Sequence, residues 1–533
     1  MRHLVVARSP HITGHITVLA SISLAAFPLA AVGGAGQGLV GACPSATHPI
    51  FRVTVTPELG FGSLAGRLII MMSNQLGPGE ELSPHPGSHS VWIVAKEVRN
   101  LVSQTPIDFD SSDMAFPDEF CRATQGNYRV RAVLDVSHHF AYRSRPADGD
   151  LVSAVVEQPF QPTASSVIRL TLVERKTDAP LQLPPRTETF DIVSPSLSAF
   201  WGQPTHMRGA VLLPPGYAAG RQRYPAVYVN HGFSQDLGTL LQRYATNVNQ
   251  LMEARKIPEM IWVMLVEAVP TGTHEFADSV NNGPWGGALT TELIPYLEKR
   301  YRMDAKASGR LLTGHSSGGW ASLWIQISHP AFFGGSWPTA PDPVDFRSFA
   351  GIDLTRRPTV NYYYLDDGSP RMFVRRGDKD TQSLEDLVRE ERVLGEYGGQ
   401  SASFDWVFSP RGKDGRPMPL FDRETGAIDP TVADYWEQHY DIATLLRNNW
   451  PKIGPLLNGK IHLTVGTADT FHLDEPARLL EQTIKEVGGK AQFNYIPGGS
   501  HFDLYQDGLL EQIANEMYTV ARPHSAANKQ PVD

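Results

Sequence analysis

The hydrophobic positions of the chain follow two different patterns. Between about residues 45 and 175, apolar and polar residues alternate in short runs, as at residues 51–55, 128–134 and 168–172. Side chains of a strand point alternately to its two faces, so this alternation is typical of strands with one buried face. Segments rich in glycine, proline and aspartate separate the runs. We therefore expect a small antiparallel β-sandwich over residues 45–175.

A second pattern begins at about residue 197. Continuous apolar runs there alternate with segments of helical spacing, and the runs are residues 226–229, 260–266, 461–465 and 492–496. Strands that are apolar on both faces need helices on both sides, as in a mostly parallel sheet. We expect an α/β domain over residues 197–520, joined to the sandwich by a proline-containing linker at residues 176–196 and followed by a flexible tail at 521–533.

The alternation of strands and helices is lost between about residues 340 and 455. This stretch is polar and rich in turns, with aromatic residues scattered through it, among them Tyr362, Trp406 and Trp436. We interpret it as an insertion in the α/β domain, placed where a cap or lid could lie.

The N-terminal pattern, over residues 1–42, indicates an export signal. Arg2 and Arg8 precede an apolar stretch from about residue 16 to 32, and no Asp, Glu, Lys or Arg occurs between Arg8 and Arg52. A membrane anchor is the alternative, but Pro28 and the modest hydrophobicity favour a cleaved peptide. No second apolar run of about 20 residues follows. We expect a secreted or periplasmic protein without a membrane span after signal removal.

The two cysteines, Cys43 and Cys121, leave three alternatives open. They could pair in an oxidising compartment, Cys43 could carry a lipid anchor, or both could be free thiols. No cysteine and histidine cluster has zinc-ligand spacing, and we expect neither a metal nor an organic cofactor. The net charge of −9 argues against a nucleic-acid partner.

The first candidate catalytic residue is Ser316, which lies in the G-x-S-x-G sequence of residues 314–318. An apolar run at 310–313 precedes it and an apolar helical segment follows at 320–328. A strand, a sharp turn and a helix in that order expose a serine hydroxyl at the end of a sheet, and small neighbours are needed at the turn. Ser316 is therefore the candidate nucleophile.

A base and an acid are expected after later strands. His501 lies in a glycine-rich loop beyond the run at 492–496, where an imidazole can reach the end of the sheet. Asp469 directly follows the run at 461–465. Asp474 is the alternative acid, although Glu475 and Pro476 after it are typical of a helix start. The chain order Ser316, Asp469, His501 is the one expected for a nucleophile on such a turn.

The oxyanion of an acyl-transfer reaction needs two backbone amide donors. We assign one to Ser317 and the other to Phe233, which follows His231 and Gly232 after the run at 226–229. His231 is expected to support this loop rather than to act as a base. Asp278, Trp285 and His315 are expected to line the substrate pocket, with ordinary loop positions as the alternative for the first two.

These segments resemble an esterase family of α/β hydrolases, the one that includes the enterochelin esterase and esterase D types. The matching segments are residues 230–233, 276–285, 314–318, 466–469 and 499–501, which together span roughly residues 200–510. The enterochelin-esterase branch is also similar in placing a β-sandwich before the catalytic domain. The resemblance implies an α/β-hydrolase fold and ester chemistry, but no particular substrate.

The sequence thus predicts an exported serine hydrolase that cleaves carboxylic esters of a small molecule or saccharide through an acyl-enzyme. An acyltransferase or a peptidase would use the same triad. A binding protein built on a hydrolase scaffold is the alternative from another class.

Overall fold

The structure, a computed structural model, describes residues 49–59, 63–84, 87–103, 105–110 and 113–523. The expected export signal, Cys43 and most of the expected tail lie outside the described residues. Cys121 is disulfide-bonded, and its pairing with Cys43, one of the three alternatives above, stays a prediction. Among the described residues no helix is both long enough and apolar enough to cross a membrane.

The N-terminal part forms one nine-stranded sheet in the order β4-β1-β9-β7-β6-β2-β3-β5, with β8 paired to β6. Its strands are β1 (Ile50–Val55), β2 (Leu64–Ser73), β3 (Trp92–Leu101), β4 (Ile107–Phe109), β5 (Ala115–Phe116), β6 (Gly126–Asp135), β7 (Leu151–Ser153), β8 (Val156–Phe160) and β9 (Val167–Arg175). A short 3-10 turn η1 (Phe120–Arg122) and helix α1 (Phe140–Arg143) lie between strands.

Alternation along these strands builds their core, as the sequence pattern predicts. Val53 of β1, Ile70 of β2, Val130 of β6 and Leu170 of β9 are all buried in one hydrophobic cluster. The expected all-antiparallel pairing needs one correction, because β1 and β9 run parallel. The two strands come from opposite ends of this region, so no hairpin joins them.

A second sheet has eight strands in the order β10-β11-β13-β12-β18-β19-β22-β23. Its strands are β10 (Thr187–Val193), β11 (His206–Leu212), β12 (Ala226–Asn230), β13 (Ile261–Leu265), β18 (Arg310–His315), β19 (Gly335–Thr339), β22 (His462–Gly466) and β23 (Gln492–Ile496). β10, β11 and β13 pair antiparallel, and all later pairs are parallel. The expected α/β-hydrolase fold is therefore confirmed.

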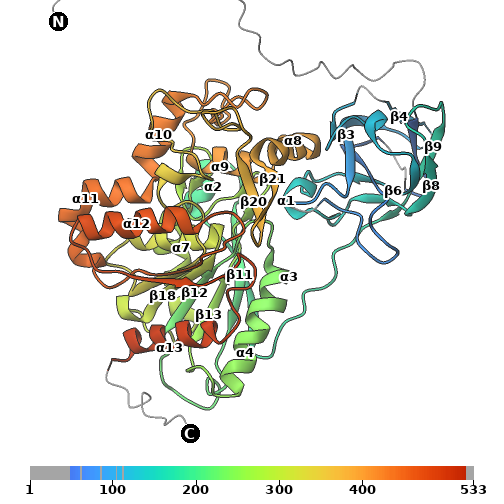
Figure 1. The fold of residues 1–533 in the computed structure, drawn as a ribbon. Helices are drawn as coiled ribbons and strands as arrows, with labels where there is room; N and C mark the ends of the chain where they lie inside the picture. Colours follow the sequence, from blue (N-terminus) through green and yellow to red (C-terminus); the bar gives the residue numbers. More distant parts are fainter. Residues whose placement is uncertain (1–48, 60–62, 85–86, 104, 111–112, 524–533) are drawn as a thin grey trace, which may run out of the picture. The chain divides into compact units, whose positions relative to one another are not determined.

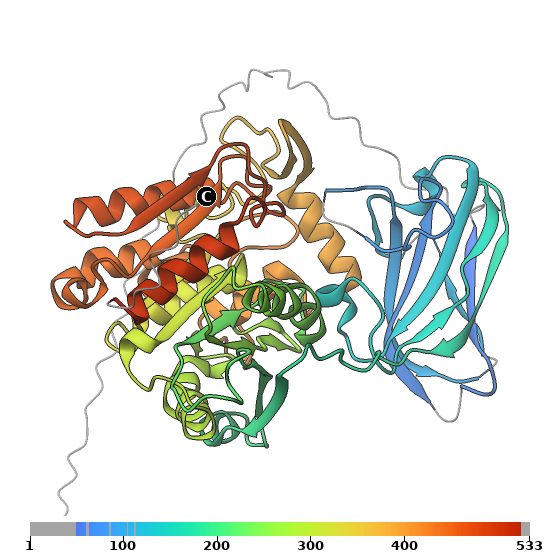
Figure 2. The same ribbon diagram turned by 90° about the horizontal axis from the view of Figure 1, so that it is seen from below.

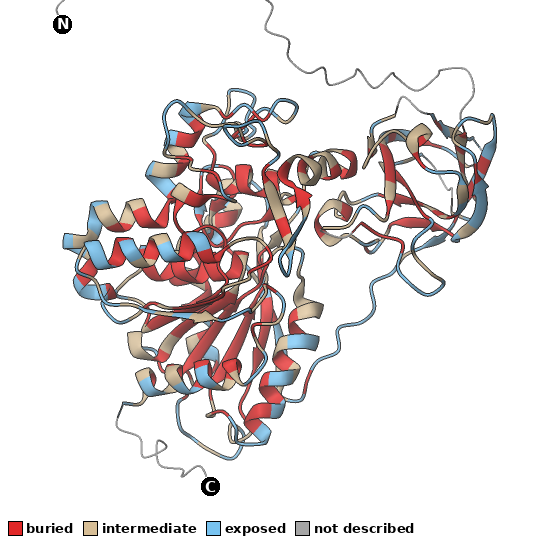
Figure 3. Ribbon diagram, viewed as in Figure 1, coloured by how far each residue is buried: buried red, intermediate tan, exposed pale blue. Residues whose placement is uncertain are grey.

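Helices cover both faces of this sheet (Figure 1). They are α2 (Pro195–Trp201), α3 (Leu237–Thr239), η2 (Leu240–Ala245), α4 (Thr246–Glu253), α5 (Trp285–Ala288), η3 (Leu289–Leu293), α6 (Ile294–Arg300), η4 (Ala307–Gly309), α7 (Ser317–Ser328), α12 (Asp474–Glu486) and α13 (Leu509–Ala521). α4 and α13 lie on one side, and α7 and α12 on the other (Figures 1 and 2). The central strands are buried almost throughout (Figure 3), as their continuous apolar sequence requires.

Three short two-stranded pairs complete the described strands: β14 (Ala268–Val269) with β15 (Gly272–Thr273), β16 (Asp278–Ser279) with β17 (Gly283–Pro284), and β20 (Met372–Arg376) with β21 (Lys379–Ser383). The first two pairs follow β13. They shape the loop between that strand and α5.

Two expectations about the elements are corrected. Residues 176–196 are only partly irregular, because 187–193 form the edge strand β10 and α2 begins at Pro195. The interval 340–455 is not mainly turns: it holds η5 (Phe346–Ser348), α8 (Leu384–Leu394), α9 (Gln400–Phe408), α10 (Pro430–Tyr440) and most of α11 (Ile442–Leu457). Its aromatic residues are largely interior, with Tyr362, Phe404 and Trp436 buried in the main hydrophobic cluster.

Candidate functional site

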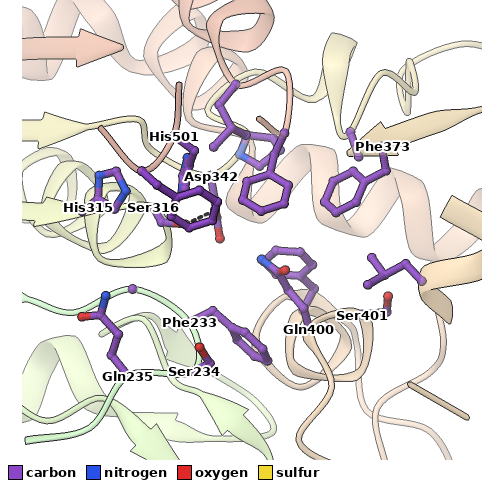
Figure 4. A pocket seen from close by; sticks show the side chains of 18 of the residues that line it. Phe233, Ser234, Gln235, His315, Ser316, Asp342, Phe373, Gln400, Ser401 and His501 are labelled. Carbon is purple, nitrogen blue, oxygen red and sulfur yellow. Dashed lines mark hydrogen bonds between the residues drawn. The ribbon is translucent and has the colours of Figure 1, made fainter. Parts of the chain in front are cut away.

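Ser316 stands at the turn between the end of β18 and the start of α7. Its φ of 60° and ψ of −125° are unusual for a residue with a side chain. Hydrogen bonds hold the turn: Ser316 N donates to Thr339 O at 3.0 Å, and Trp320 N donates to Ser316 O at 3.0 Å. The turn places Ser316 in the wall of a cavity of about 420 Å³ (Figure 4).

The two glycines of the motif are required by crowding. A Cβ atom at Gly314 would lie 2.1 Å from Gly318 O, and one at Gly318 would lie 2.3 Å from Asn230 O. Neither neighbour is a flexible side chain, so the backbone would have to move. The G-x-S-x-G pattern thus reflects the close approach of β18, α7 and β12.

His501 and Asp469 form a buried pair beside Ser316. His501 Nδ1 lies 2.9 Å from Asp469 Oδ2, and the two side chains are 3% and 0% exposed. The rings of Phe471 and Phe502 contact the imidazole edge to face, with centroids 4.8 and 5.1 Å away. This packing fixes the plane of the His501 ring.

The surroundings of Asp469 keep it ionised. Burial alone would raise its pKa, but the hydrogen bond and charge of His501 and the amides of Phe471 and Leu473 lower the pKa of Asp469 below its ordinary value. Those amides donate to Oδ1 at 2.9 and 3.2 Å. An ionised carboxylate only accepts hydrogen bonds, so the proton of neutral His501 sits on Nδ1 and Nε2 is free to accept one.

The alternative acid, Asp474, has a different role. It lies in the first turn of α12, where Arg375 donates to its Oδ1 at 3.0 Å. Arg375 also donates from Nε to the backbone carbonyl of Asp469 at 2.7 Å. Asp474 therefore anchors an arginine that supports the Asp469 loop, whereas Asp469 contacts the imidazole.

A second carboxyl group, Asp342, lies beside Ser316. Ser316 Oγ donates to Asp342 Oδ1 at 3.3 Å, and Ser317 Oγ donates to Asp342 Oδ2 at 2.6 Å. Burial raises the pKa of Asp342, and the hydrogen bond from Ser317 and the nearby His501 partly oppose this. Of the described side chains, Asp342 and not His501 accepts the Ser316 hydroxyl in this arrangement. A rotation about the Cα–Cβ bond of Ser316 is needed to direct that hydroxyl to the imidazole.

Two further histidines near Ser316, His231 and His315, are in their neutral form. His231 Nε2 accepts from Glu267 N at 2.7 Å and its Nδ1 bonds Gly232 O at 2.8 Å, so it supports the loop as expected. Burial lowers the pKa of His231 to about 4. His315 stands 4.4 Å from His501 between ring centroids and lines the cavity, and burial together with His501 lowers its pKa to about 3.

The two residues expected to supply amide donors lie close to Ser316. Ser317 is the first residue of the twelve-residue helix α7, whose N-terminal amides and dipole favour negative charge. Phe233 follows β12 and lines the cavity below Ser316 (Figure 4). A Cβ atom at Gly232 would be only 3.2 Å from His315 O, which shows how closely this loop approaches the turn.

Two expected pocket residues are not in the cavity wall. Trp285 is 4% exposed, and its ring stacks on His274 at 3.7 Å between centroids. Asp278 accepts from Gly287 N at 3.0 Å and so fixes the start of α5. Both belong to the loop after β13, which packs into the protein instead of lining the cavity, and this corrects the sequence-based expectation.

The cavity wall includes residues that the sequence analysis did not identify. Figure 4 shows Phe373, Gln400 and Ser401 facing Ser316, Asp342 and His501 across the cavity. Asp342 comes just beyond the end of β19, the same kind of position that singled out Asp469. The residues from β20 and α9 carried no comparable signal. Among the described residues, no group of three or more His, Cys, Asp or Glu side chains could hold a metal ion.

Comparison with solved structures finds similar chains of low sequence identity. A ferulic acid esterase is 16% identical, with a TM-score of 0.38 over 63% of this chain and 98% of that chain. An S-formylglutathione hydrolase from Agrobacterium tumefaciens is 14% identical, with a TM-score of 0.36 over 63% of this chain and 94% of that chain. FphF, a fluorophosphonate-binding serine hydrolase of Staphylococcus aureus, is 14% identical, with a TM-score of 0.36 over 62% and 97%.

Sequence comparison finds similarity to curated proteins and to one family model. The uncharacterized protein YbbA of Bacillus subtilis is 25% identical over 140 residues, which are 24% of this chain and 53% of YbbA. The chain thus spans about half the length of this relative. The model of the family described as "Putative esterase" matches residues 202–509, more than half of the 533-residue chain. The protein therefore belongs to this esterase family.

Proposed function

We propose that the protein is an exported serine hydrolase that cleaves carboxylic esters through an acyl-enzyme. The observation that carries the proposal is the buried pair of His501 and Asp469, 2.9 Å apart, beside Ser316 on its strained turn. Membership of the esterase family supports the reaction class. Export rests on the pattern of the first 42 residues, which lie outside the described part of the chain.

In the proposed mechanism Ser316 Oγ attacks the ester carbonyl and its proton passes to His501 Nε2. Asp469 holds the opposite ring nitrogen and stabilises the imidazolium that forms. The amides of Ser317 and Phe233 donate to the oxyanion. When the tetrahedral intermediate collapses, His501 returns the proton to the leaving alcohol. Water then attacks the acyl-enzyme by the same route, releasing the acid and restoring Ser316.

Replacing Ser316 tests this mechanism. We expect Ser316→Ala to lower kcat for p-nitrophenyl acetate by at least about 10³-fold, since the nucleophile is lost while the oxyanion donors stay. Ser165→Ala, at an exposed serine before β9, is the matched control and should keep full turnover. A fluorophosphonate probe should label the wild type and Ser165→Ala but not Ser316→Ala. Undiminished turnover by Ser316→Ala would exclude the mechanism.

The same assay separates the alternatives that share the triad. A competing acceptor alcohol would divert most of the acyl group in an acyltransferase, whereas a hydrolase releases mainly the free acid. The anilide that corresponds to p-nitrophenyl acetate would be turned over by a peptidase. We expect the free acid as product and no anilide cleavage.

A further inference from the structure

The walls of the Ser316 cavity differ in chemical character. One part is apolar and largely aromatic, formed by residues such as Phe349, Phe373, Leu387, Phe404, Phe471 and Phe502. Three arginines, Arg143, Arg145 and Arg243, also line the cavity, and we call them its cationic wall. Among the described residues of the lining, Asp342 alone carries a carboxyl group, which is buried and hydrogen-bonded to Ser316 and Ser317.

The three arginines have few acidic partners. Arg143 and Arg145 both donate to the same atom, Asp236 Oδ2, at 3.0 and 2.6 Å. The other oxygen, Oδ1, accepts from the backbone amide and the hydroxyl of Thr239. Arg143 also reaches Asp178, whose side chain is half exposed. Asp236 carries one negative charge against two guanidinium groups, and the second carboxylate, Asp178, is half exposed and outside the cavity lining, so the cavity wall itself keeps a positive charge.

Arg243 adds to that charge. It lies in η2, its side chain is exposed, and it forms no ion pair with any described acidic residue. Arg143 and Arg145 have a structural explanation, because both pair with Asp236. Arg243 has no such explanation, although it lines the same cavity.

The cationic wall is also close to the reacting atoms. Asp236 comes three residues after Phe233, whose amide is the proposed oxyanion donor. Tyr142, next to Arg143, contacts the Phe233 ring edge to face with centroids 4.9 Å apart and donates to Gln235 O at 2.9 Å. The segment with Arg143 and Arg145 is thereby fixed against the oxyanion loop.

We infer that the substrate is an anionic ester, with a carboxylate or phosphate-type group held by Arg143, Arg145 and Arg243 and an apolar group against the aromatic wall. The inference rests on the proposed esterase function and names the substrate class for that site. Guanidinium groups bind such oxyanions through paired hydrogen bonds. Attraction of the anion into a partly enclosed cavity also raises its local concentration.

Matched pairs of chromogenic or acetylated esters test the inference, with each anionic ester compared with its neutral counterpart. The acid-side pair is mono-p-nitrophenyl glutarate and its methyl ester. The alcohol-side pairs are 4-acetoxybenzoate and 4-acetoxyphenylphosphonate, each against its fully methylated form. We expect kcat/KM to favour the anionic member at least fivefold in one or more pairs, and the pair that shows it identifies the anionic group and its side of the ester.

Arginine variants assign the preference to these side chains. Arg243→Gln and Arg145→Gln should each reduce the anionic-to-neutral ratio of kcat/KM roughly 2- to 5-fold, the range expected for a charge-assisted contact that is partly exposed. The ratio should also fall as ionic strength rises. Arg208→Gln is the matched control, because Arg208 is 58% exposed, pairs with Asp191 and is outside the cavity lining. It should leave the ratio unchanged.

The outcomes separate this inference from the proposed function. Equal kcat/KM for both members of every pair, with turnover that still requires Ser316, would overturn the anionic substrate class and leave the serine mechanism intact. A preference that persists unchanged in both arginine variants would overturn its assignment to this wall. Turnover that survives Ser316→Ala would instead remove the mechanism on which the inference rests.

Discussion

The backbone of Ser316 is held in a conformation that few residues adopt. A φ of 60° with ψ of −125° costs on the order of 1–3 kcal/mol. The hydrogen bonds to Thr339 O and from Trp320 N, with the packing of α7 on β18, offset that cost. The strain is confined to Ser316, because strand β18 before it and helix α7 after it are regular.

The crowding at Gly318 gives a test at this scale. Gly318→Ala would put a methyl group 2.3 Å from the backbone oxygen of Asn230. We expect a loss of about 1–3 kcal/mol of folding stability. We also expect kcat to fall while the variant is still folded, because β12 leads into the loop of Phe233, the proposed oxyanion donor, and would have to shift. Thermal unfolding and p-nitrophenyl acetate kinetics measure the two effects.

Gly287→Ala is the control for that substitution. Its added methyl group would have no heavy atom nearer than 3.9 Å among those outside its own helix. This variant should unfold at nearly the wild-type temperature and retain activity. Equal behaviour of the two variants would mean that crowding at the turn does not set the conformation of Ser316.

At the residue scale the sequence predicted the members of the site that directly follow recognisable strands. Asp469 and His501 follow apolar runs, and the structure brings their side chains together. Asp342 also follows a strand, but β19 is only five residues long and contains Pro338, so its pattern was weak. The prediction that Trp285 lines the pocket was wrong. Its ring is buried against His274 of the same loop, and spacing along the chain does not reveal such a contact.

At the scale of elements, the strand–turn–helix unit around Ser316 was predictable and the helices of 340–455 were not. Helix α8 has a local signal, since Ser383 accepts from Asp386 N as an N-cap. Helix α11 contains Pro451 and Pro455, which normally argue against a helix interior. Its packing on α12 and α7 sustains it, and those contacts involve residues distant in the sequence.

The buried carboxyl group of Glu390, on α8, makes the stability of this element pH-dependent. Burial, with the adjacent negative charge of Glu391, raises the pKa of Glu390 to about 8. Its value in the unfolded chain is near 4.5. As pH rises from about 4.5 to 8, the unfolded chain loses this proton before the folded one does. The stabilisation is therefore complete below pH 4.5 and is lost as pH approaches 8.

We expect Glu390→Gln to remove that dependence, since a neutral amide of similar volume does not titrate. Between pH 5 and 8 the wild type should lose on the order of 3 kcal/mol more stability than Glu390→Gln. Thermal unfolding at several pH values measures the difference. Glu396→Gln, at a side chain that is 76% exposed, is the control and should follow the wild type. Parallel curves for wild type and Glu390→Gln would contradict the prediction.

At the scale of the whole described chain, two kinds of sheet were predictable because each has its own hydrophobic period. The contacts that join the N-terminal strands to the α/β part were not. Arg67 of β2 donates to the carbonyl of Val393, 326 residues later, and Tyr142 of α1 donates to Gln235 O in the loop after β12. Such contacts depend on how surfaces match, and no periodicity within either segment encodes them.

At this scale we predict that the N-terminal part helps to hold the loop of Phe233 in place, through the contact of Tyr142. Tyr142→Ala removes both the ring contact with Phe233 and the hydrogen bond to Gln235 O, so the amide of Phe233 should be held less firmly. We expect kcat for p-nitrophenyl acetate to fall about tenfold at temperatures where the variant remains folded by circular dichroism, with a smaller change in KM. Tyr142→Phe keeps the ring contact, so its kcat should fall less than about threefold. An unchanged kcat in Tyr142→Ala would show that the loop of Phe233 holds its geometry without the Tyr142 contact.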